Sequence, residues 1–409
     1  MSVPIQEIGM PRFVFQRSQS AAARRAASDL IAGLERDIRS LCAESARISR
    51  QQFVPENALL GRCLRPEASG PHFLEVLPTD LCNHACGWCF TTGSRSTGVV
   101  DSRLLRTRLE AFLESGGRTV LLSGGGEPLL FKPLSVPSAE FEGTTAVGWL
   151  ARKGATVGVI TNGVFLDRFL TANEKFIDAI AFIRVSLDAY TPAGHEVFHQ
   201  AGPGDFARTL SAIREIIRMR GQSRTPAVGC SFLVDAALGL NSAIQDFESI
   251  DFLAANLGVD FVQIKHTHCP HKDFADAQMV RVGNILDRLP KRNHQWWIHR
   301  YLDSKGETRC LVPEVAQVLR SDGRRSPCCH LQRFALEEPD LSIEGFSAFS
   351  VVGCSSDVCR YVSTNRFLQT LERGELEQVA ALEGLKHSLE CHGFHPYRLF
   401  PSSPDLVLN

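Results

Sequence analysis

Three cysteines lie within eight residues of one another, in the sequence CNHACGWC that runs from Cys82 through Cys86 to Cys89. A structural zinc site normally has four protein ligands that close a tetrahedral shell, and this segment has no fourth cysteine nearby. Three thiolates instead suit a cubane iron–sulfur cluster, because one of its irons then stays open to a substrate or cofactor. Zinc, or cysteines that are simply buried, are the alternatives.

The balance of charge limits the partners of the chain. Its 409 residues include 44 basic and 45 acidic side chains, for a formal charge of −1. This balance argues against nucleic acid or an anionic membrane and favours a small molecule or a peptide. No apolar run reaches the roughly 18 residues of a membrane span, and no signal-peptide core is evident, so we expect a cytoplasmic protein. Thirteen cysteines in a reducing compartment favour metal or redox chemistry over disulfides.

The elements that position the cysteines belong to an alternating pattern of strands and helices, typical of a parallel α/β domain. Six strands are expected at 73–77, 119–123, 156–160, 182–187, 227–234 and 261–265. Helices are expected between them at 102–115, 143–153, 164–176, 205–219 and 241–257. The most unusual residues follow the strands, which places the chemistry at their C-terminal ends. The pattern predicts a partial (β/α)6 barrel like that of TIM, with an open sheet as the alternative.

Two further segments flank this domain. Residues 1–70 contain one amphipathic helix, whose apolar face is formed by Leu30, Ile31, Leu34, Ile38 and Leu41. Beyond about residue 300 the alternation is lost and cysteines become dense. We therefore expect an N-terminal helical extension at 1–70, the barrel at 71–299 and a small, irregular, metal-bearing domain at 300–409.

The cysteine segment resembles the signature of the radical S-adenosylmethionine (SAM) enzymes, in which an aromatic residue, here Trp88, precedes the third cysteine. In that family the open iron binds the amine and carboxylate of the methionine part of SAM. An electron from the cluster then cleaves the sulfonium to give a 5′-deoxyadenosyl radical. The resemblance implies a [4Fe–4S] cluster with an open iron site, SAM, and an external electron donor such as flavodoxin or ferredoxin.

A glycine-rich turn after the second expected strand carries the next part of the resemblance. The sequence GGGEP from Gly124 to Pro128 matches the GGE motif of the family, although glycines commonly serve only to turn a chain. In the family this motif meets the methionine amino group of SAM. The resemblance assigns that role to Gly125, Gly126 and Glu127.

Two turns further along the chain are similar to the family's contacts with the SAM carboxylate and ribose. Thr161-Asn162-Gly163 follows the third strand, and Ser186-Leu187-Asp188 ends the fourth. Each alone is equally typical of a turn or helix cap. The resemblance implies that Asn162, Ser186 and Arg184 contact the cofactor and that Asp188 contacts either cofactor or substrate. It covers residues 72 to 265, and the adenine-binding glycines of the fifth strand are poorly matched at 229–234.

The C-terminal cysteines resemble the SPASM and twitch extensions of radical SAM enzymes, which hold auxiliary four-iron clusters around a hairpin. A hairpin is expected at Asp322-Gly323. The resemblance implies one auxiliary [4Fe–4S] cluster, with ligands Cys310, Cys328, Cys354 and Cys359. Either Cys329 or Cys391 is an alternative ligand, and zinc in the same set is an alternative metal. The fuller SPASM pattern needs about seven cysteines, and six lie here.

Histidines cluster just past the sixth strand, where a barrel has its mouth. His266 and His268 are candidate proton donors or acceptors there, and Lys265 is a further candidate. Surface histidines without a function are the alternative. Together with Asp188 these residues form the expected catalytic set.

We expect hydrogen abstraction from a small sugar-like natural product, such as an aminoglycoside, an aminocyclitol or a nucleoside, in antibiotic biosynthesis. Acidic residues such as Asp188 and Asp235 suit an aminated ligand. The outcome is dehydration, dehydrogenation or epimerisation, as in a lyase or an oxidoreductase. The alternative is a peptide maturase of the SPASM type that modifies a ribosomal precursor peptide. A non-catalytic iron–sulfur or zinc scaffold is the alternative from another class.

Overall fold

The structure is a computed structural model of the 409-residue chain. It describes residues 5–7, 32–34, 36–37, 70–89, 91, 97–221, 225–235, 241–266, 280–290, 292–299, 302–303, 309–328, 349–352, 358–359, 361–362, 365–366, 368–369 and 406–408. The fold is therefore described continuously over most of the region in which strands and helices are expected to alternate.

A parallel sheet forms the centre of the molecule, and all six predicted strands are confirmed in it. They pair in chain order as β2 Phe73–Val76, β3 Thr119–Leu122, β4 Thr156–Thr161, β5 Ile180–Ser186, β6 Ala227–Val234 and β7 Phe261–His266. Most of their residues are buried, because a parallel sheet is covered on both faces and its strands read as nearly continuous apolar runs.

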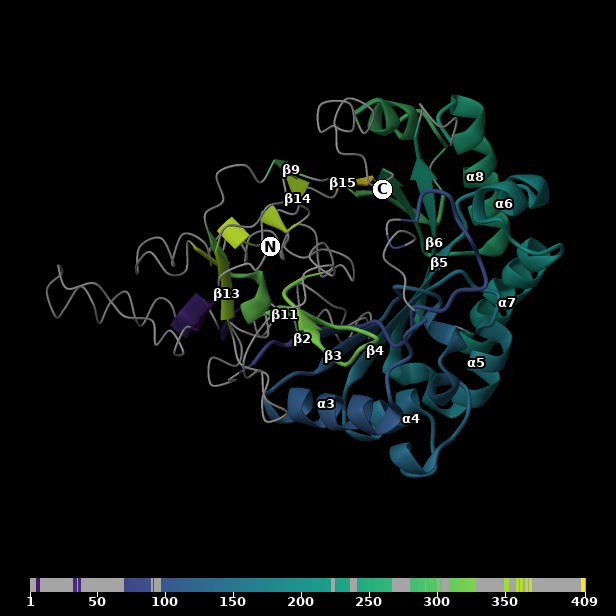
Figure 1. Ribbon diagram of the computed structural model, residues 1–409. Helices are drawn as coiled ribbons and strands as arrows, with labels where there is room; N and C mark the ends of the chain where they lie inside the picture. The colour runs from purple at the N-terminus through teal and green to yellow at the C-terminus, as the bar shows by residue number, and fades with distance from the viewer. Residues whose placement is uncertain are drawn as a thin grey trace, which may run out of the picture.

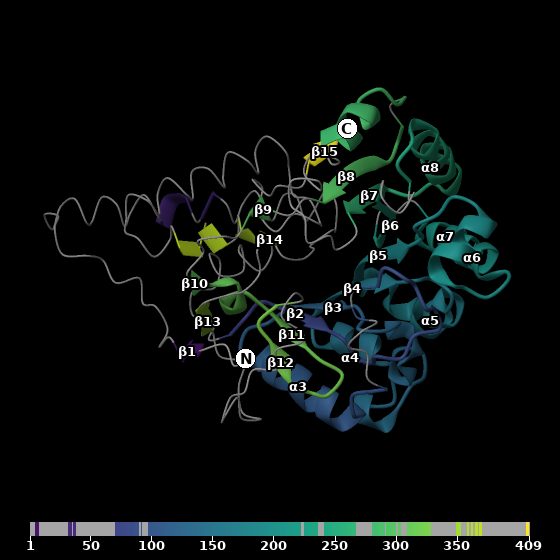
Figure 2. The ribbon, with the colours of Figure 1, turned by 45° about the horizontal axis from the view of Figure 1, so that its top comes forward.

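Four more strands extend this sheet to ten. β8 Gln295–His299 pairs in parallel with β7, and β11 Ala316–Leu319 pairs in parallel with β2. Antiparallel strands β15 Leu406–Leu408 and β12 Arg325–Ser326 form the two edges. Within the described residues these edges do not pair with each other. The sheet is thus open, as expected for a partial barrel in the α/β class (Figure 2).

The predicted hairpin at Asp322-Gly323 is confirmed, and it continues the main sheet. β11 and β12 form its two arms, and Gly323 takes the left-handed conformation with a φ of 77° that the turn requires. Its first arm lies beside β2, the strand that leads into the three cysteines. Residues 316–319 therefore pair with β2, the strand that leads into the cysteine segment.

The expected helices cover the outer face of the sheet in an arc (Figure 1). The structure confirms α3 Ser102–Glu114, α4 Ala146–Arg152, α5 Leu166–Asn173, α7 Asp205–Arg220 and α8 Ile244–Leu257. A short helix that the sequence did not predict, α6 Pro192–His199, lies between β5 and α7. Large side chains of these helices, such as Phe112, Trp149, Phe169 and Phe247, are fully buried against the strands and form the core.

The described parts of the two flanking segments are short. Residues 32–34 and 36–37 are helical, and Leu34 is buried, as the N-terminal helix predicts. β1 Ile5–Glu7, which was not predicted, pairs with β13 Phe349–Val352, and β13 pairs with β10 Arg309–Cys310. A second small pair joins β9 Leu302–Asp303 to β14 Val358–Cys359. None of the described helices is long and apolar enough to cross a membrane. The bounds of the three expected domains stay predictions.

Candidate active site

The three cysteines lie on an irregular segment between β2 and α3, at the C-terminal edge of the sheet. All three side chains are partly exposed. The segment turns tightly, with the Cys89 N–H donating to the Cys86 carbonyl at 3.2 Å and the His84 N–H donating to Cys82 Sγ at 3.4 Å. The turn thus presents three thiols from one short piece of chain.

The glycine-rich turn after β3 packs directly on the start of the cysteine segment. Backbone N–H groups of Gly126 and Glu127 donate to the carbonyls of Thr79 and Leu81, at 3.0 and 2.7 Å. A Cβ atom on Gly126 would lie 2.0 Å from the Leu81 carbonyl oxygen. Only glycine fits such a close approach of two backbones, so this turn fixes the course of the cysteine segment.

A threonine hydroxyl joins the same turn to the third cysteine. Thr91 Oγ1 lies 3.0 Å from Cys89 Sγ and donates to the Gly125 carbonyl at 2.7 Å. A Cβ on Gly125 would lie 2.5 Å from Asp80 Oδ1, so a side chain there would require the Asp80 carboxylate to move. The predicted motif residues Gly125 and Gly126 therefore hold the segment through backbone contacts.

Glu127 is buried, and its carboxylate accepts hydrogen bonds from one side-chain hydroxyl and two backbone N–H groups. Oε1 accepts from Thr161 Oγ1 at 2.7 Å and from the Leu129 N–H at 3.0 Å, while Oε2 accepts from the Asn162 N–H at 2.8 Å. Burial raises the pKa of Glu127 to about 6, although the three hydrogen bonds act in the opposite direction. In the described structure this carboxylate couples the end of β4 to the glycine-rich turn.

Replacement of Glu127 by glutamine is expected to remove a pH dependence of stability. The pKa of about 6 in the folded protein lies above the ordinary 4.5, so this group favours folding below pH 4.5 and loses that contribution as the pH rises through 6. The difference in unfolding free energy between the unsubstituted protein and Glu127→Gln should fall by about 2 kcal/mol across that window. Urea unfolding from pH 4 to pH 8 measures it, and a constant difference would contradict the expectation.

The third motif joins the first two at the end of β4. Asn162 Nδ2 donates to Asn83 Oδ1 in the cysteine segment at 2.8 Å, and the Asn162 backbone is held by Glu127. The cysteine segment, the glycine-rich turn and the Thr161-Asn162-Gly163 turn, which are separate in the sequence, therefore meet at one point of the sheet edge. The roles of Glu127 and Asn162 toward a cofactor stay predictions.

Other predicted residues line neighbouring strands. Arg184 Nη1 donates to Gln263 Oε1 at 2.6 Å, from β5 to β7. Ser186 lies opposite Ser231 of β6. Lys265 and His266 end β7, and His266 is buried. These residues lie toward the C-terminal ends of their strands, at the same edge of the sheet as the cysteine segment.

Asp188 is buried just past β5, and its backbone takes the left-handed conformation with a φ of 53°. Oδ1 accepts from the Leu233 N–H at 2.9 Å, and Oδ2 lies 3.4 Å from His199 Nε2. Burial raises the pKa of Asp188 although the nearby Lys265 ammonium acts to lower it. The predicted contact of this carboxyl group with substrate or cofactor stays a prediction.

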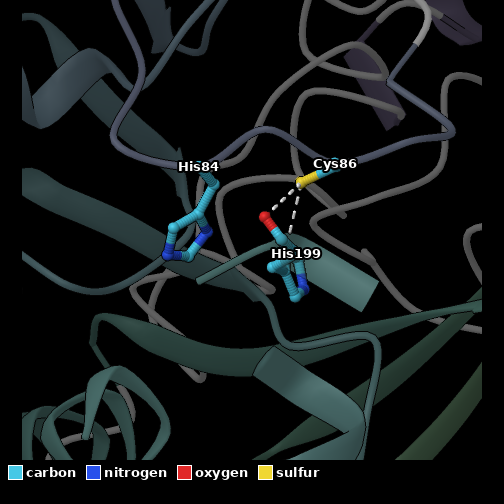
Figure 3. A group of neighbouring side chains, drawn as sticks. All are labelled: His84, Cys86 and His199. Carbon is cyan, nitrogen blue, oxygen red and sulfur yellow. Dashed lines mark hydrogen bonds between the residues drawn. The ribbon is translucent and has the colours of Figure 1, made fainter. Parts of the chain in front are cut away.

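Sequence reasoning missed the helix α6, on which the cysteine segment rests. The Ala85 N–H donates to the His199 carbonyl at 3.1 Å, and Cys86 Sγ lies 3.2 Å from His199 Nδ1 (Figure 3). Trp88 packs edge-on against Phe198, with ring centroids 5.5 Å apart. The spacing of His195 and His199, which places both rings on one face of a helix, was the signal that could have found it.

Several predicted residues lie outside the described part of the chain, namely His268, Cys354, Cys329 and Cys391. Of the remaining C-terminal cysteines, Cys310 lies in β10, Cys359 lies in β14, and Cys328 follows β12. Their side chains are partly exposed. The auxiliary cluster therefore stays a prediction.

The donors of the cysteine segment fit a cubane cluster. Three thiols from one turn are all partly exposed, and burial, followed by the charges of Asp188 and Cys89, raises the pKa of the Cys86 thiol to about 12. Such a thiol stays protonated at neutral pH unless a metal takes the place of its proton.

Comparison with known proteins agrees with this geometry. Residues 76–228 match the family model of the radical SAM superfamily, a family that uses a [4Fe–4S] cluster and SAM. No curated protein matches the chain.

Solved structures of similar fold were also found. Streptococcus suis SuiB bound to the precursor peptide SuiA has a TM-score of 0.50 and 12% identity, over 71% of this chain and 67% of SuiB. SuiB bound to S-adenosylmethionine has a TM-score of 0.49 and 12% identity over 68% of this chain, which spans 65% of that SuiB chain, just under two thirds. Native anSMEcpe with bound AdoMet and Kp18Cys peptide has a TM-score of 0.47 and 15% identity, over 68% of this chain and 79% of the other. At 12% identity, the likeness to SuiB with its bound precursor peptide is one of fold alone.

Proposed function

Because residues 76–228 match the radical SAM family model, we propose that this chain is an enzyme in which Cys82, Cys86 and Cys89 hold the [4Fe–4S] cluster that cleaves SAM. When bound, the cluster and SAM supply the 5′-deoxyadenosyl radical that removes a hydrogen atom from a substrate carbon. The observation that carries the proposal is the meeting of the three-cysteine segment, the glycine-rich turn and the Thr161-Asn162-Gly163 turn at one sheet edge.

The residues of the chain itself do the work of positioning. The backbone contacts of Gly126 and the hydroxyl of Thr91 fix the direction in which the cysteine segment turns. The buried Glu127 carboxylate keeps Asn162 at the same edge. Arg184 and Ser186 lie further along this edge as predicted contacts of SAM. Lys265 and His266 lie there as predicted proton donors or acceptors, and Asp188 as a predicted contact of cofactor or substrate.

For the substrate we propose a peptide in preference to the expected sugar-like product. The fold is shared at a TM-score of 0.50 with SuiB, whose structure was solved with a bound precursor peptide. A balanced formal charge of −1 also suits a peptide. A sugar-like natural product remains the second candidate, supported by the buried acidic side chains Asp188 and Asp235 near the end of the sheet.

Transfer of deuterium distinguishes the two substrate classes. The reduced enzyme is incubated with SAM and either a deuterated precursor peptide encoded beside its gene or a deuterated aminoglycoside, and the label in 5′-deoxyadenosine is measured. We expect label from the peptide and none from the aminoglycoside. A neighbourhood without a small precursor-peptide gene, together with label from the aminoglycoside, would restore the sugar-like substrate.

The auxiliary cluster, the electron donor and the compartment belong to the same proposal. We propose that Cys310, Cys328, Cys354 and Cys359 hold an auxiliary cluster, supported by the positions of Cys310 and Cys359 on short strands and of Cys328 beyond the hairpin. A flavodoxin or ferredoxin supplies the electron, and the enzyme works in the cytoplasm. An auxiliary cluster held by these cysteines would supply an electron acceptor and so favour reaction as an oxidoreductase, whereas a chain without that cluster would favour reaction as a lyase.

A further inference from the structure

A cluster of buried imidazoles lies behind the cysteine segment and has no part in the proposed reaction. His84 comes from the segment itself, and His195 and His199 come from α6. The rings of His195 and His199 are 4.6 Å apart between centroids, and that of His84 lies 5.2 Å from His199. All three side chains are almost completely buried. Three polar rings in an apolar interior call for an explanation, since burial of a polar group is costly unless it is satisfied.

One cysteine of the segment points into this cluster. Ligand atoms of His84, Cys86 and His199 all lie within 4.8 Å of one another, and they form the one such group of His, Cys or carboxylate side chains within the described residues. Figure 3 shows the three side chains facing one another. In a tetrahedral zinc site, bonds of 2.3 Å to sulfur and about 2.05 Å to nitrogen place two ligand atoms about 3.6 Å apart. The 3.2 Å between Cys86 Sγ and His199 Nδ1 is already close to that separation.

The second nitrogen of each ligand histidine is held as in metal sites. His199 Nε2 donates to the Leu187 carbonyl at 3.2 Å and lies 3.4 Å from Asp188 Oδ2. His84 Nε2 lies 3.3 Å from Asp205 Oδ2 at the start of α7. A metal-bound histidine almost always donates its other N–H to a carboxylate or a backbone carbonyl, which fixes the ring and its tautomer. Both rings therefore present their remaining nitrogen, Nδ1, for a ligand.

A third imidazole, that of His195, packs against this group. Neither ring nitrogen of His195 has a hydrogen-bond partner within the described structure, and the residue is completely buried. A metal ion beside it would give one of these nitrogens a function, because neutral imidazole is the form that binds metals. Glu196, the next residue of the helix, is exposed, so it does not act as the base that H-E-x-x-H helices of metalloproteases use.

We propose that His84, Cys86 and His199 bind a single zinc-like divalent ion in the protein that lacks its cluster. His195 or a water molecule completes the four ligands. A mixed set of imidazoles and one thiolate suits zinc and cobalt. Because Cys86 also belongs to the cluster ligands, the ion and the cluster exclude each other, and a bound ion delays assembly of the cluster. Only this last consequence rests on the proposed function.

A cobalt titration under anaerobic conditions tests the site. The iron-free chain and every variant carry alanine at the proposed auxiliary ligands Cys310, Cys328, Cys354 and Cys359, because those thiolates would bind cobalt themselves. We expect one equivalent of Co²⁺ to bind with a single thiolate-to-cobalt charge-transfer band. The affinity for Co²⁺ should fall at least about ten-fold in His84→Ala and in His199→Ala. The matched control is the double variant Cys82→Ala/Cys89→Ala, which keeps Cys86 and should bind within about two-fold of the chain that carries only the four auxiliary-ligand alanines. The proposal would be overturned by the opposite pattern, in which the double variant loses Co²⁺ binding and the two histidine variants keep it.

Zinc X-ray absorption on the chain that carries only the four auxiliary-ligand alanines keeps the test independent of how the histidine variants fold. One sulfur and two or three nitrogens around zinc are expected. Two or three sulfurs would assign the ion to the cysteine segment alone, and absence of stoichiometric binding would also refute the site. Neither measurement uses SAM, so each outcome is separate from the success or failure of the radical SAM assignment.

Discussion

Replacement of Cys86 by alanine is expected to abolish formation of 5′-deoxyadenosine from SAM while leaving the protein folded. The cluster would lose one of its three ligands, and with it the site at which SAM is cleaved. The rate should fall at least about a thousand-fold, to that of protein without iron. The fold should survive because the Cys86 side chain is partly exposed on an irregular segment. Its contact with His199 contributes about 1 kcal/mol.

A second cysteine serves as the matched control for this experiment. Cys230 is completely buried in β6 and belongs to no predicted ligand set. Cys230→Ala removes the same atoms as Cys86→Ala and should cost stability through the cavity it leaves, by about 1–2 kcal/mol, yet keep 5′-deoxyadenosine formation. Production by Cys86→Ala at the unsubstituted rate, measured by chromatography after dithionite reduction, would refute the cluster assignment.

Replacement of Gly126 by alanine is expected to displace the cysteine segment and prevent the cluster from being retained. The new Cβ would lie 2.0 Å from the Leu81 carbonyl oxygen and 2.5 Å from the Asp80 carbonyl carbon. Both atoms belong to the backbone, so the strain cannot be relieved by a change of rotamer, and a destabilisation of about 3 kcal/mol or more is expected. Iron content after anaerobic reconstitution, together with urea unfolding, measures the two effects.

The matched control for this change lies within the cysteine segment itself. A Cβ on Gly87 would meet no atom within 4 Å, and its φ is not in the left-handed region. Gly87→Ala should therefore reconstitute with the same iron content and unfold within about 0.5 kcal/mol of the unsubstituted protein. Equal iron contents in both alanine variants would show that the close approach at Gly126 does not fix the segment.

The central sheet was predictable because its strands are buried on both faces. Runs such as TVGVI and AVGCSFLV have few polar residues and end at turns, and β6 was predicted with the bounds that the structure gives. The outer strands β8 and β11 lie among less regular sequence, and their place depends on pairing with β7 and β2. α6 is only eight residues long, and its apolar positions do not form the period that identifies a helix.

The motifs of the site were predictable, and their contacts were not. The three cysteines and the glycine-rich turn are recognisable because each lies within a few consecutive residues. The hydrogen bond between Asn162 and Asn83 spans 79 positions, and the contact between Cys86 and His199 spans 113. Such contacts depend on how the sheet brings separate loops together. The histidine cluster behind Cys86 therefore became visible only in the folded chain.

The measurement that tests the central claim most directly is an anaerobic iron and sulfide count, with Mössbauer spectroscopy, on the unsubstituted protein and on the variant with Cys82, Cys86 and Cys89 all replaced by alanine. The account predicts that the variant holds about four fewer irons per chain, as one cubane cluster requires. Any iron that remains in the variant belongs to the proposed auxiliary cluster. If the variant holds no iron, the enzyme has one cluster only. Equal iron contents in the two proteins would contradict a cluster at the three cysteines.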